Sequence, residues 1–136
     1  MALPTKLLLE VVTPAGLLFR DEVDEVTAPG ELGYFGVRPG HTPFLSILGM
    51  GEIAYREGTQ WRRLTCFWGF CEVLPDRVNV LADIGERPED IDVTRAEEAM
   101  KDAAERMKSL RDEQGYAEAR ASYTRAVTRL AVARKP

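Results

Sequence analysis

The stretch Asp92–Gln114 reads DVTRAEEAMKDAAERMKSLRDEQ, and at its start the composition of the chain changes abruptly. Before Asp92 lie 10 of the 11 glycines and 7 of the 8 prolines, whereas Glu89–Gln114 contains neither. Small and apolar residues recur through the stretch at intervals of three and four, which is the spacing of one face of an α-helix. The sequence therefore predicts helical structure here, after a body of a different kind.

Two helical stripes follow one another along the chain. Their members are Val93, Ala96, Met100, Ala103, Met107 and Leu110, and then Tyr116, Ala119, Tyr123, Ala126, Leu130 and Ala133. We expect one helix over about Val93–Leu110 and a second over about Ala117–Ala133, with Gly115 ending the first or beginning the turn. A connection this short predicts an antiparallel two-helix hairpin.

The start and the packing of this hairpin also follow from the sequence. Asp92 is the expected N-cap of the first helix, and Asp90 is the alternative. Five of the twelve stripe residues are alanines, and a buried alanine contributes much less than the roughly 1.5–3 kcal/mol of a large apolar side chain. The hairpin is therefore expected to depend on contacts with the body, and an arm of this kind is a candidate for a movable element.

The body before the hairpin has the pattern of short β-strands. Segments rich in β-branched and aromatic residues recur along it, separated by turn signals such as Pro29-Gly30, Pro39-Gly40 and Pro75-Asp76. The expected strands are Lys6–Thr13, Gly16–Arg20, Glu22–Ala28, Tyr34–Val37, Phe44–Leu48, Gly51–Glu57, Gln60–Phe67, Phe70–Leu74 and Arg77–Ala82. This regular succession of short strands and turns predicts an antiparallel β-sandwich or flattened barrel over residues 1–88, with the helical hairpin over residues 89–136.

Charge is distributed unevenly along the chain, whose net charge is −4. Residues 1–91 carry 14 acidic and 8 basic side chains, whereas residues 117–136 carry 1 acidic and 5 basic ones. A nucleic-acid-binding protein usually spreads its basic patch over the fold, so we expect no nucleic-acid partner. A single basic helix instead favours an acidic protein surface or an anion, and the alternative is a solvated helix face.

Several other classes of function are not supported. The only histidine, His41, leaves no second candidate base for a catalytic triad, and no catalytic residue or metal site is predicted. Cys66 and Cys71 are expected to be buried small apolar residues. No apolar stretch approaches the ~20 residues of a membrane-spanning helix, and Met1–Lys6 lacks a secretion-signal pattern, so no direct membrane insertion is expected.

Three arginines suggest an anion site. Arg125 and Arg129 lie one turn apart on the second helix, and in an antiparallel hairpin Arg95 would approach Arg129. Guanidinium groups beside Asp92 and a helix N-terminus would suit a nucleotide phosphate. The alternative is that all three side chains point into water. His41, in the rigid loop Arg38–Pro43, either caps a turn or belongs to a contact loop.

Several strings of residues, in this order and on this plan, carry a family resemblance. They are Leu9-Glu10-Val11-Val12-Thr13-Pro14, Val37-Arg38-Pro39-Gly40-His41-Thr42-Pro43, Gly69-Phe70-Cys71-Glu72-Val73, Ile91-Asp92-Val93-Thr94-Arg95-Ala96 and Arg125-Ala126-Val127-Thr128-Arg129-Leu130. Over nearly its whole length the chain resembles the epsilon subunit of the bacterial and chloroplast rotary ATP synthase, which is called delta in mitochondria.

The resemblance implies a fold and a function. The fold is a β-sandwich of about ten strands followed by the antiparallel two-helix hairpin. The function is that of a non-catalytic subunit of the central stalk, bound to the gamma subunit and the ring of c subunits, which couples rotation of the ring to the alpha/beta catalytic head. The hairpin is implied to inhibit ATP hydrolysis. The implied location is peripheral, on the cytoplasmic face of the inner (plasma) membrane.

The resemblance also implies site residues. Glu31 and His41 match the ring-contact region, and the arginines implied to meet the beta subunits are Arg120, Arg125, Arg129 and Arg134. No cofactor is required, but some members bind regulatory ATP, and the matching residues here are Ile91, Asp92, Arg95, Ala96, Arg125 and Arg129. Those members carry a further arginine where this chain has Asp102, whose charge would repel phosphate. The alternative function is therefore an ATP-sensing module in the same complex.

Overall fold

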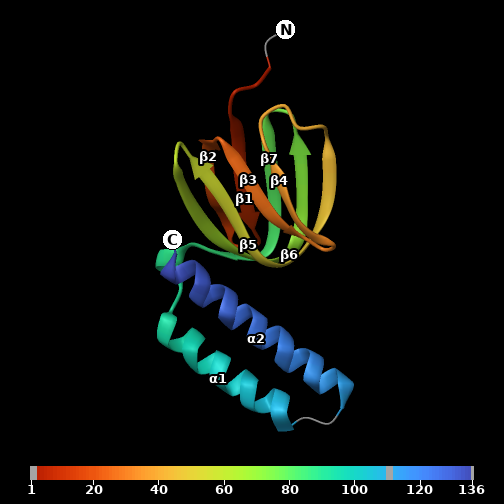
Figure 1. The fold of residues 1–136 in the computed structure, drawn as a ribbon, viewed down its shortest axis with the longest axis vertical. Coiled ribbons are helices and arrows are strands. Elements are labelled where there is room, and N and C mark those ends of the chain that lie inside the picture. Colours follow the sequence, from red (N-terminus) through yellow and green to blue (C-terminus); the bar gives the residue numbers. More distant parts are fainter. Residues whose placement is uncertain (1–2, 110–111, 136) are drawn as a thin grey trace.

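The computed structural model describes residues 3–109 and 112–135, which form a β-domain followed by two helices (Figure 1). The strands are β1 (Leu7–Thr13), β2 (Gly16–Val23), β3 (Glu25–Gly30), β4 (Gly33–Val37), β5 (Phe44–Glu57), β6 (Gln60–Leu74) and β7 (Arg77–Glu86). A short 3₁₀ helix, η1 (Pro88–Asp90), leads to the helices α1 (Val93–Ser109) and α2 (Glu113–Arg134). The predicted order of a β-sandwich and then a helical hairpin is confirmed.

The described strands number seven, whereas the sequence pattern predicted nine and the resemblance implied about ten, because β5 and β6 each unite two of the nine expected strands. The strand order is β2-β1-β7-β6-β5-β3-β4. The first part of β5 pairs with the later part of β6, as at Leu48↔Gly69, and this part of β6 pairs with β7. The later part of β5 pairs with β3, as at Val26↔Tyr55. Each half was predicted as a separate strand because Gly49, Gly51 and Gly69 interrupt the apolar runs.

One strand pair departs from the expected antiparallel arrangement. β1 and β7 run parallel, with Leu9 opposite Val78, while every other pairing in the described sheet is antiparallel. These two strands lie at opposite ends of the β-domain sequence, so no hairpin turn sets their direction. Their pairing joins the N-terminal hairpin β1–β2 to the long strands and closes the sheet around the core.

The bend in β6 falls at Trp68 and Gly69. Trp68 has a φ of 61°, the only positive φ at a non-glycine residue in the described part of the chain, and Gly69 has a φ of 134°. A Cβ atom on Gly69 would collide with the carbonyl oxygen of Leu81 and lie 2.9 Å from the Cα of Ala82, both on the neighbouring β7. Glycine is therefore required at this position for β6 to adopt this backbone conformation while it stays paired with β7.

The core lies entirely inside the sandwich. Its side chains come from both layers and include Leu7, Leu9, Val11, Val26, Leu48, Ile53, Leu64, Val73, Val78 and Val80. Cys66 and Cys71 are free and fully buried, as predicted, and burial raises the pKa of each thiol to about 12. Because no helix residue belongs to this cluster, the sandwich is expected to fold without the hairpin.

The first helix begins as predicted. The Oδ1 atom of Asp92 accepts a hydrogen bond of 3.1 Å from the backbone N–H of Arg95, so Asp92 is the N-cap. The alternative, Asp90, lies in η1. The predicted last residue of this helix, Leu110, lies outside the described residues.

The second helix begins earlier than predicted, at Glu113 rather than Ala117. Asp112 is its N-cap, and its Oδ2 atom accepts a hydrogen bond of 2.8 Å from the backbone N–H of Gly115. The prediction that Gly115 ends α1 or begins the turn is therefore wrong, because this cap starts the helix before the glycine.

Fewer residues are buried between the two helices than the predicted stripes contain. The buried residues are Ala96, Ala103, Ala119, Ala126 and Leu130. Val93 and Tyr116, at the ends of the stripes, are 36% and 41% exposed. Val132 is fully buried in place of the predicted Ala133. The reason is that α2 buries a second face, which is turned toward the sandwich.

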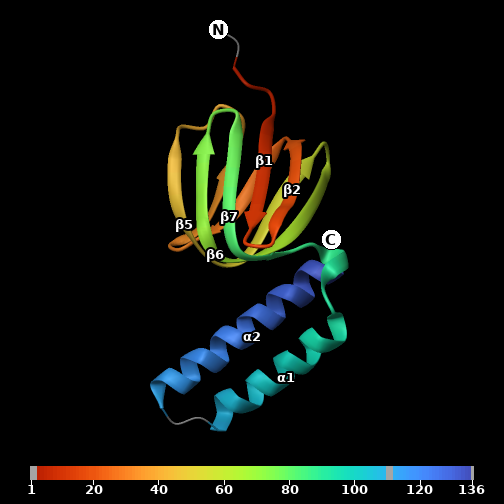
Figure 2. The ribbon, with the colours of Figure 1, turned by 180° about the vertical axis from the view of Figure 1, so that it is seen from behind.

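The hairpin lies across one end of the sandwich, with α2 between α1 and the strands, and the N-terminus lies at the opposite end (Figures 1 and 2). Arg63 of β6 donates a hydrogen bond of 3.4 Å to the carbonyl oxygen of Lys135, just after α2. Within residues 3–109 and 112–135, neither helix combines the length and apolar content that a membrane crossing requires.

Candidate functional site

A cavity of about 330 Å³ lies where α1 and α2 meet the linker, residues 87–92, which joins the sandwich to α1. It is lined by Glu86, Asp90, Ile91, Asp92, Arg95, Ala96, Ala99 and Arg129. The antiparallel hairpin brings the start of α1 beside the end of α2, so Arg95 and Arg129 share this cavity, as expected. Five of the six residues assigned to a nucleotide from the sequence therefore line one hollow.

The electrostatics of the cavity are mixed. Two arginines, Arg95 and Arg129, face three carboxylates, those of Glu86, Asp90 and Asp92. Glu86 was not predicted as a site residue. An external polyanion entering here would meet the arginines but also the charges that already balance them, so this cavity suits phosphate less well than three free guanidinium groups would.

Arg129 already has partners on the sandwich. Its Nε atom lies 2.9 Å from Oε1 and 3.1 Å from Oε2 of Glu86, the last residue of β7. Its guanidinium carbon lies 5.1 Å from the ring centre of Phe67 on β6. The Arg129 and Glu86 side chains are only 28% and 27% exposed, so this ion pair is screened less than a surface pair.

Arg125 is not part of the cavity. Its guanidinium carbon lies 5.7 Å from the ring centre of Trp68, and Nη2 donates a hydrogen bond of 3.1 Å to Oγ of Ser122. The expectation that Arg95, Arg125 and Arg129 gather around one anion is therefore wrong for Arg125 in this conformation. One turn of α2 separates Arg125 from Arg129, and this turn places Arg125 over β6 instead.

Asp102 also lies outside the cavity. Its carboxylate faces Arg106 one turn further along α1, with Oδ2 3.9 Å from Nη1, and its side chain is 71% exposed. The predicted repulsion of phosphate by Asp102 would act only from a distance in this conformation. The nearer carboxylates of Glu86 and Asp92 are the charges that oppose an anion.

The four arginines assigned to a beta-subunit contact do not share one environment. Arg120 is exposed, and Arg134 is exposed beside Glu97, at 4.0 Å. Arg125 and Arg129 are partly buried against the sandwich. An acidic partner could therefore reach Arg120 and Arg134 in this conformation, but it would have to displace existing contacts to reach the other two.

The remaining candidate residues, Glu31 and His41, lie on loops of the sandwich. Glu31 occupies the turn between β3 and β4, where its N–H donates a hydrogen bond of 2.9 Å to the carbonyl oxygen of Ile47. His41 follows β4, and its Nδ1 atom lies 2.6 Å from the carbonyl oxygen of Thr42, while its backbone N–H donates a hydrogen bond of 3.1 Å to the carbonyl oxygen of Arg38. These contacts fit the turn-capping alternative for His41 and leave both loops accessible.

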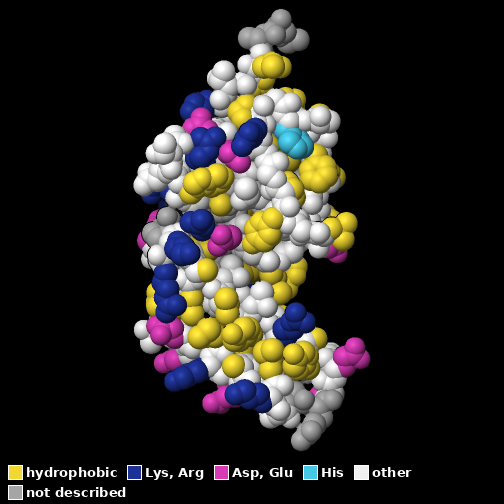
Figure 3. Space-filling view, in the orientation of Figure 1, with side chains coloured by type: hydrophobic (Ala, Val, Ile, Leu, Met, Phe, Trp, Pro, Cys, Tyr) yellow, Lys and Arg dark blue, Asp and Glu magenta, His cyan; other side chains and the backbone are white. Residues whose placement is uncertain are grey.

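An apolar surface accompanies these loops. A hollow of about 450 Å³ is lined by the β3–β4 turn and the start of β5, and Leu32, Leu45 and Ile47 around it are 102%, 70% and 53% exposed. Figure 3 shows the single histidine beside hydrophobic side chains on this part of the molecule. These apolar residues were not singled out from the sequence, although the unalternating run Phe44–Leu48 was a signal that both faces of the strand are apolar.

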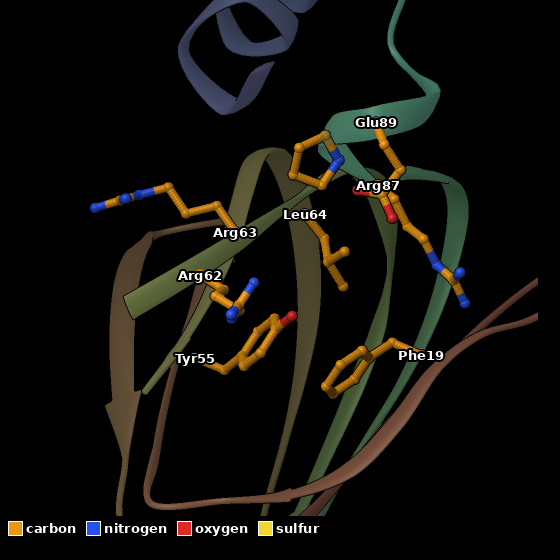
Figure 4. A pocket seen from close by; sticks show the side chains of 8 residues that line it. Phe19, Tyr55, Arg62, Arg63, Leu64, Arg87 and Glu89 are labelled. Atoms are coloured by element: carbon orange, nitrogen blue, oxygen red, sulfur yellow. The ribbon is translucent and has the colours of Figure 1, made fainter. Parts of the chain in front are cut away.

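A further cavity of about 310 Å³ lies where the sandwich meets the linker (Figure 4). Phe19 and Tyr55 face each other in it, with ring centres 4.5 Å apart, and burial raises the pKa of Tyr55. Arg87 donates hydrogen bonds to the carbonyl oxygen of Leu18, one of them at 2.9 Å from Nε. These bonds hold the linker against β2. We therefore interpret the cavity as part of the connection that sets the orientation of the hairpin relative to the sandwich.

Two family models match the chain. One is described as "ATP synthase, Delta/Epsilon chain, beta-sandwich domain" and matches residues 6–88, and the other as "ATP synthase, Delta/Epsilon chain, long alpha-helix domain" and matches residues 89–134. Together they cover nearly the whole chain.

Curated relatives are similar over nearly the same span. "ATP synthase epsilon chain 2" of Syntrophotalea carbinolica is 45% identical over 129 residues, 94% of this chain and 94% of the relative. The epsilon chains of Geobacter metallireducens and Solibacter usitatus are 43% and 44% identical over 96% and 98% of this chain and 95% and 99% of their own lengths.

Two solved structures share the fold. A chain in the mitochondrial ATP synthase of Euglena gracilis, described as OSCP/F1/c-ring, aligns with a TM-score of 0.80 at 19% identity, covering 94% of this chain and 81% of that one. A chain in the central stalk and c-ring of the Tetrahymena thermophila mitochondrial ATP synthase aligns with a TM-score of 0.63 at 15% identity, covering 96% and 99%.

Proposed function

This chain belongs to the delta/epsilon family of ATP synthase subunits, and from that premise we propose that it couples rotation of the c-ring to the catalytic head and inhibits ATP hydrolysis through α2. The proposed partners are the gamma subunit, the c-ring and the alpha/beta head, at the cytoplasmic face of the membrane. The two solved structures that share this fold come from ATP synthase assemblies, one described as OSCP/F1/c-ring and the other as central stalk and c-ring. Their origin supports this role.

The observation that carries the proposal is the way α2 is held. Its contacts with the sandwich that involve Arg125 and Arg129 are ionic and cation–π contacts with Glu86, Phe67 and Trp68. Such contacts can be exchanged for those with an acidic surface elsewhere at little net cost, whereas a large apolar interface could not. A basic helix held in this way is suited to a second binding partner.

For the coupling role, we expect Glu31→Lys to lower ATP-driven proton pumping severalfold in membranes that contain the assembled complex, while the rate of ATP hydrolysis is largely kept. The reason is that a lysine at the exposed β3–β4 turn reverses the charge of Glu31, which we assign to the c-ring contact and which lies beside an exposed apolar surface. Glu22→Lys, the same change at an exposed position on β2, is the control. Pumping that falls equally in both variants, or in neither, would show that the turn is not the contact.

The second candidate function is ATP sensing, and the cavity shared by Arg95 and Arg129 favours it. Calorimetric titration of the whole chain with ATP is expected to show saturable binding that Arg95→Ala abolishes, because Arg95 is the cavity arginine without an ion pair among those found in the described residues. ATP at ~100 times its dissociation constant would stabilise the folded hairpin by about 2.7 kcal/mol. Absence of binding at millimolar ATP would leave α2 as a mechanical and inhibitory element alone.

A further inference from the structure

Thr65 is a polar side chain in an unusual position. Among the described residues, it is the only polar one in the fully buried set, with 0% of its surface exposed. It lies on β6, directly opposite Glu86 on β7 in the antiparallel pairing. Burying a hydroxyl costs free energy unless it has a partner, so this hydroxyl needs an explanation.

The partner of Thr65 is the carboxylate that holds Arg129. Thr65 Oγ1 donates a hydrogen bond of 2.9 Å to Oε1 of Glu86, and the same Oε1 atom lies 2.9 Å from Nε of Arg129. The three side chains thus form a continuous network from the core of the sandwich to α2, which we call the docking network. The donated bond restricts the rotation of the Glu86 carboxylate and orients it toward the helix.

We propose that Thr65 is a positioning residue that acts through Glu86 to hold α2 on the sandwich, and that Arg129 becomes available to an acidic partner only when Glu86 releases it. Among the hydrogen bonds of the described residues, the Thr65 hydroxyl bonds to Glu86 and not to either helix. It orients the carboxylate that competes, inside the chain, with any external carboxylate for the same guanidinium group. The part concerning an acidic partner rests on the proposed inhibitory function, whereas the docking itself does not.

Val132 offers a direct measure of docking. It is fully buried and lies three residues after Arg129 and seven after Arg125, on the face of α2 that meets the sandwich. A cysteine introduced as Val132→Cys would react with a thiol reagent only when α2 leaves the strands. The native Cys66 and Cys71 are buried and have raised pKa values of about 12, so they are expected to stay unreactive.

The experiment compares two substitutions of Thr65 in the full chain carrying Val132→Cys. Thr65→Val keeps the volume but removes the hydroxyl, and Thr65→Ser keeps the hydroxyl but removes a methyl group. We expect Thr65→Val to speed the labelling of the new cysteine about fivefold, the factor given by losing one buried hydrogen bond of about 1 kcal/mol. Thr65→Ser is expected to label at nearly the parent rate.

Two results would overturn the proposal. One is a labelling rate that Thr65→Val leaves unchanged. The other is a general loss of core packing, which would show itself as an equal acceleration by Thr65→Ser or as new reactivity of the neighbouring Cys66. If Thr65→Val does not fold, Glu86→Gln decides: it must accelerate labelling, since it removes the charge that pairs with Arg129. The measurement needs no nucleotide and no other subunit. A negative result would therefore leave the proposed stalk function standing, and a failure of the stalk function would leave the docking network standing.

Discussion

Replacing Gly69 by alanine is expected to destabilise the sandwich by roughly 4 kcal/mol, enough to lower its melting temperature by about 20 °C. Gly69 has a φ of 134°, which side chains rarely tolerate. An added Cβ would also collide with the backbone of β7 at Leu81 and Ala82. Backbone cannot rotate away as a side chain can, so β6 and β7 would have to separate at the bend.

Thermal unfolding of the whole chain, followed by far-ultraviolet circular dichroism, measures this effect. Gly58→Ala is the matched control, because Gly58 also has a positive φ, of 64°, but its added Cβ would meet no atom within 4 Å. That variant should lose only about 1 kcal/mol. If the two variants melted at the same temperature, the close approach of β7 would not be what requires glycine at position 69.

Removing residues 92–136 is expected to raise ATP hydrolysis by the assembled complex severalfold while the sandwich remains folded and incorporated. The core cluster lies wholly within the strands, so the body should unfold cooperatively without the helices. The truncated chain lacks α2 and with it all the arginines proposed to meet the beta subunits. The measurement is the rate of ATP hydrolysis by the purified complex with the full or the truncated chain.

Arg120→Glu in the full chain refines this experiment. Arg120 is exposed on α2, so reversing its charge should weaken an acidic contact without disturbing the docking of α2. We expect this variant to raise hydrolysis in the same direction as the truncation, but less. Hydrolysis that is the same with the full and the truncated chain would rule out inhibition by the hairpin, and the coupling role of the sandwich would still stand.

Local sequence patterns predicted the helices and strands well where apolar residues recur at a regular spacing without interruption. The three- and four-residue spacing located both helices, and Asp92 was recognised as a cap because only a short polar side chain there can accept from Arg95. The same reasoning failed at Gly115, because the cap at Asp112 starts α2 before the glycine. It also divided β5 and β6, because a glycine in a long bent strand looks in sequence like the end of a strand.

The candidate cavity was predicted in part. The antiparallel hairpin follows from a short connection, and it necessarily brings Arg95 toward Arg129. Glu86 and Thr65 were missed because their importance depends on which strand ends meet α2, and nothing local in the sequence specifies that. Arg125 was assigned to the cavity because its position on the helix is known from the sequence, whereas its neighbour Trp68 is not.

The sequence by itself determined the kinds of element, their order, the family and the basic character of α2, because each of these depends on residues close together in the chain. Only the tertiary structure decided where the basic side chains are held. Arg129 pairs with Glu86 because the end of β7 faces α2, and Arg125 lies over Trp68 because Trp68 is on the part of β6 that faces α2. Such contacts join residues more than forty positions apart, and their geometry is set by the packing of the whole sandwich rather than by any local pattern.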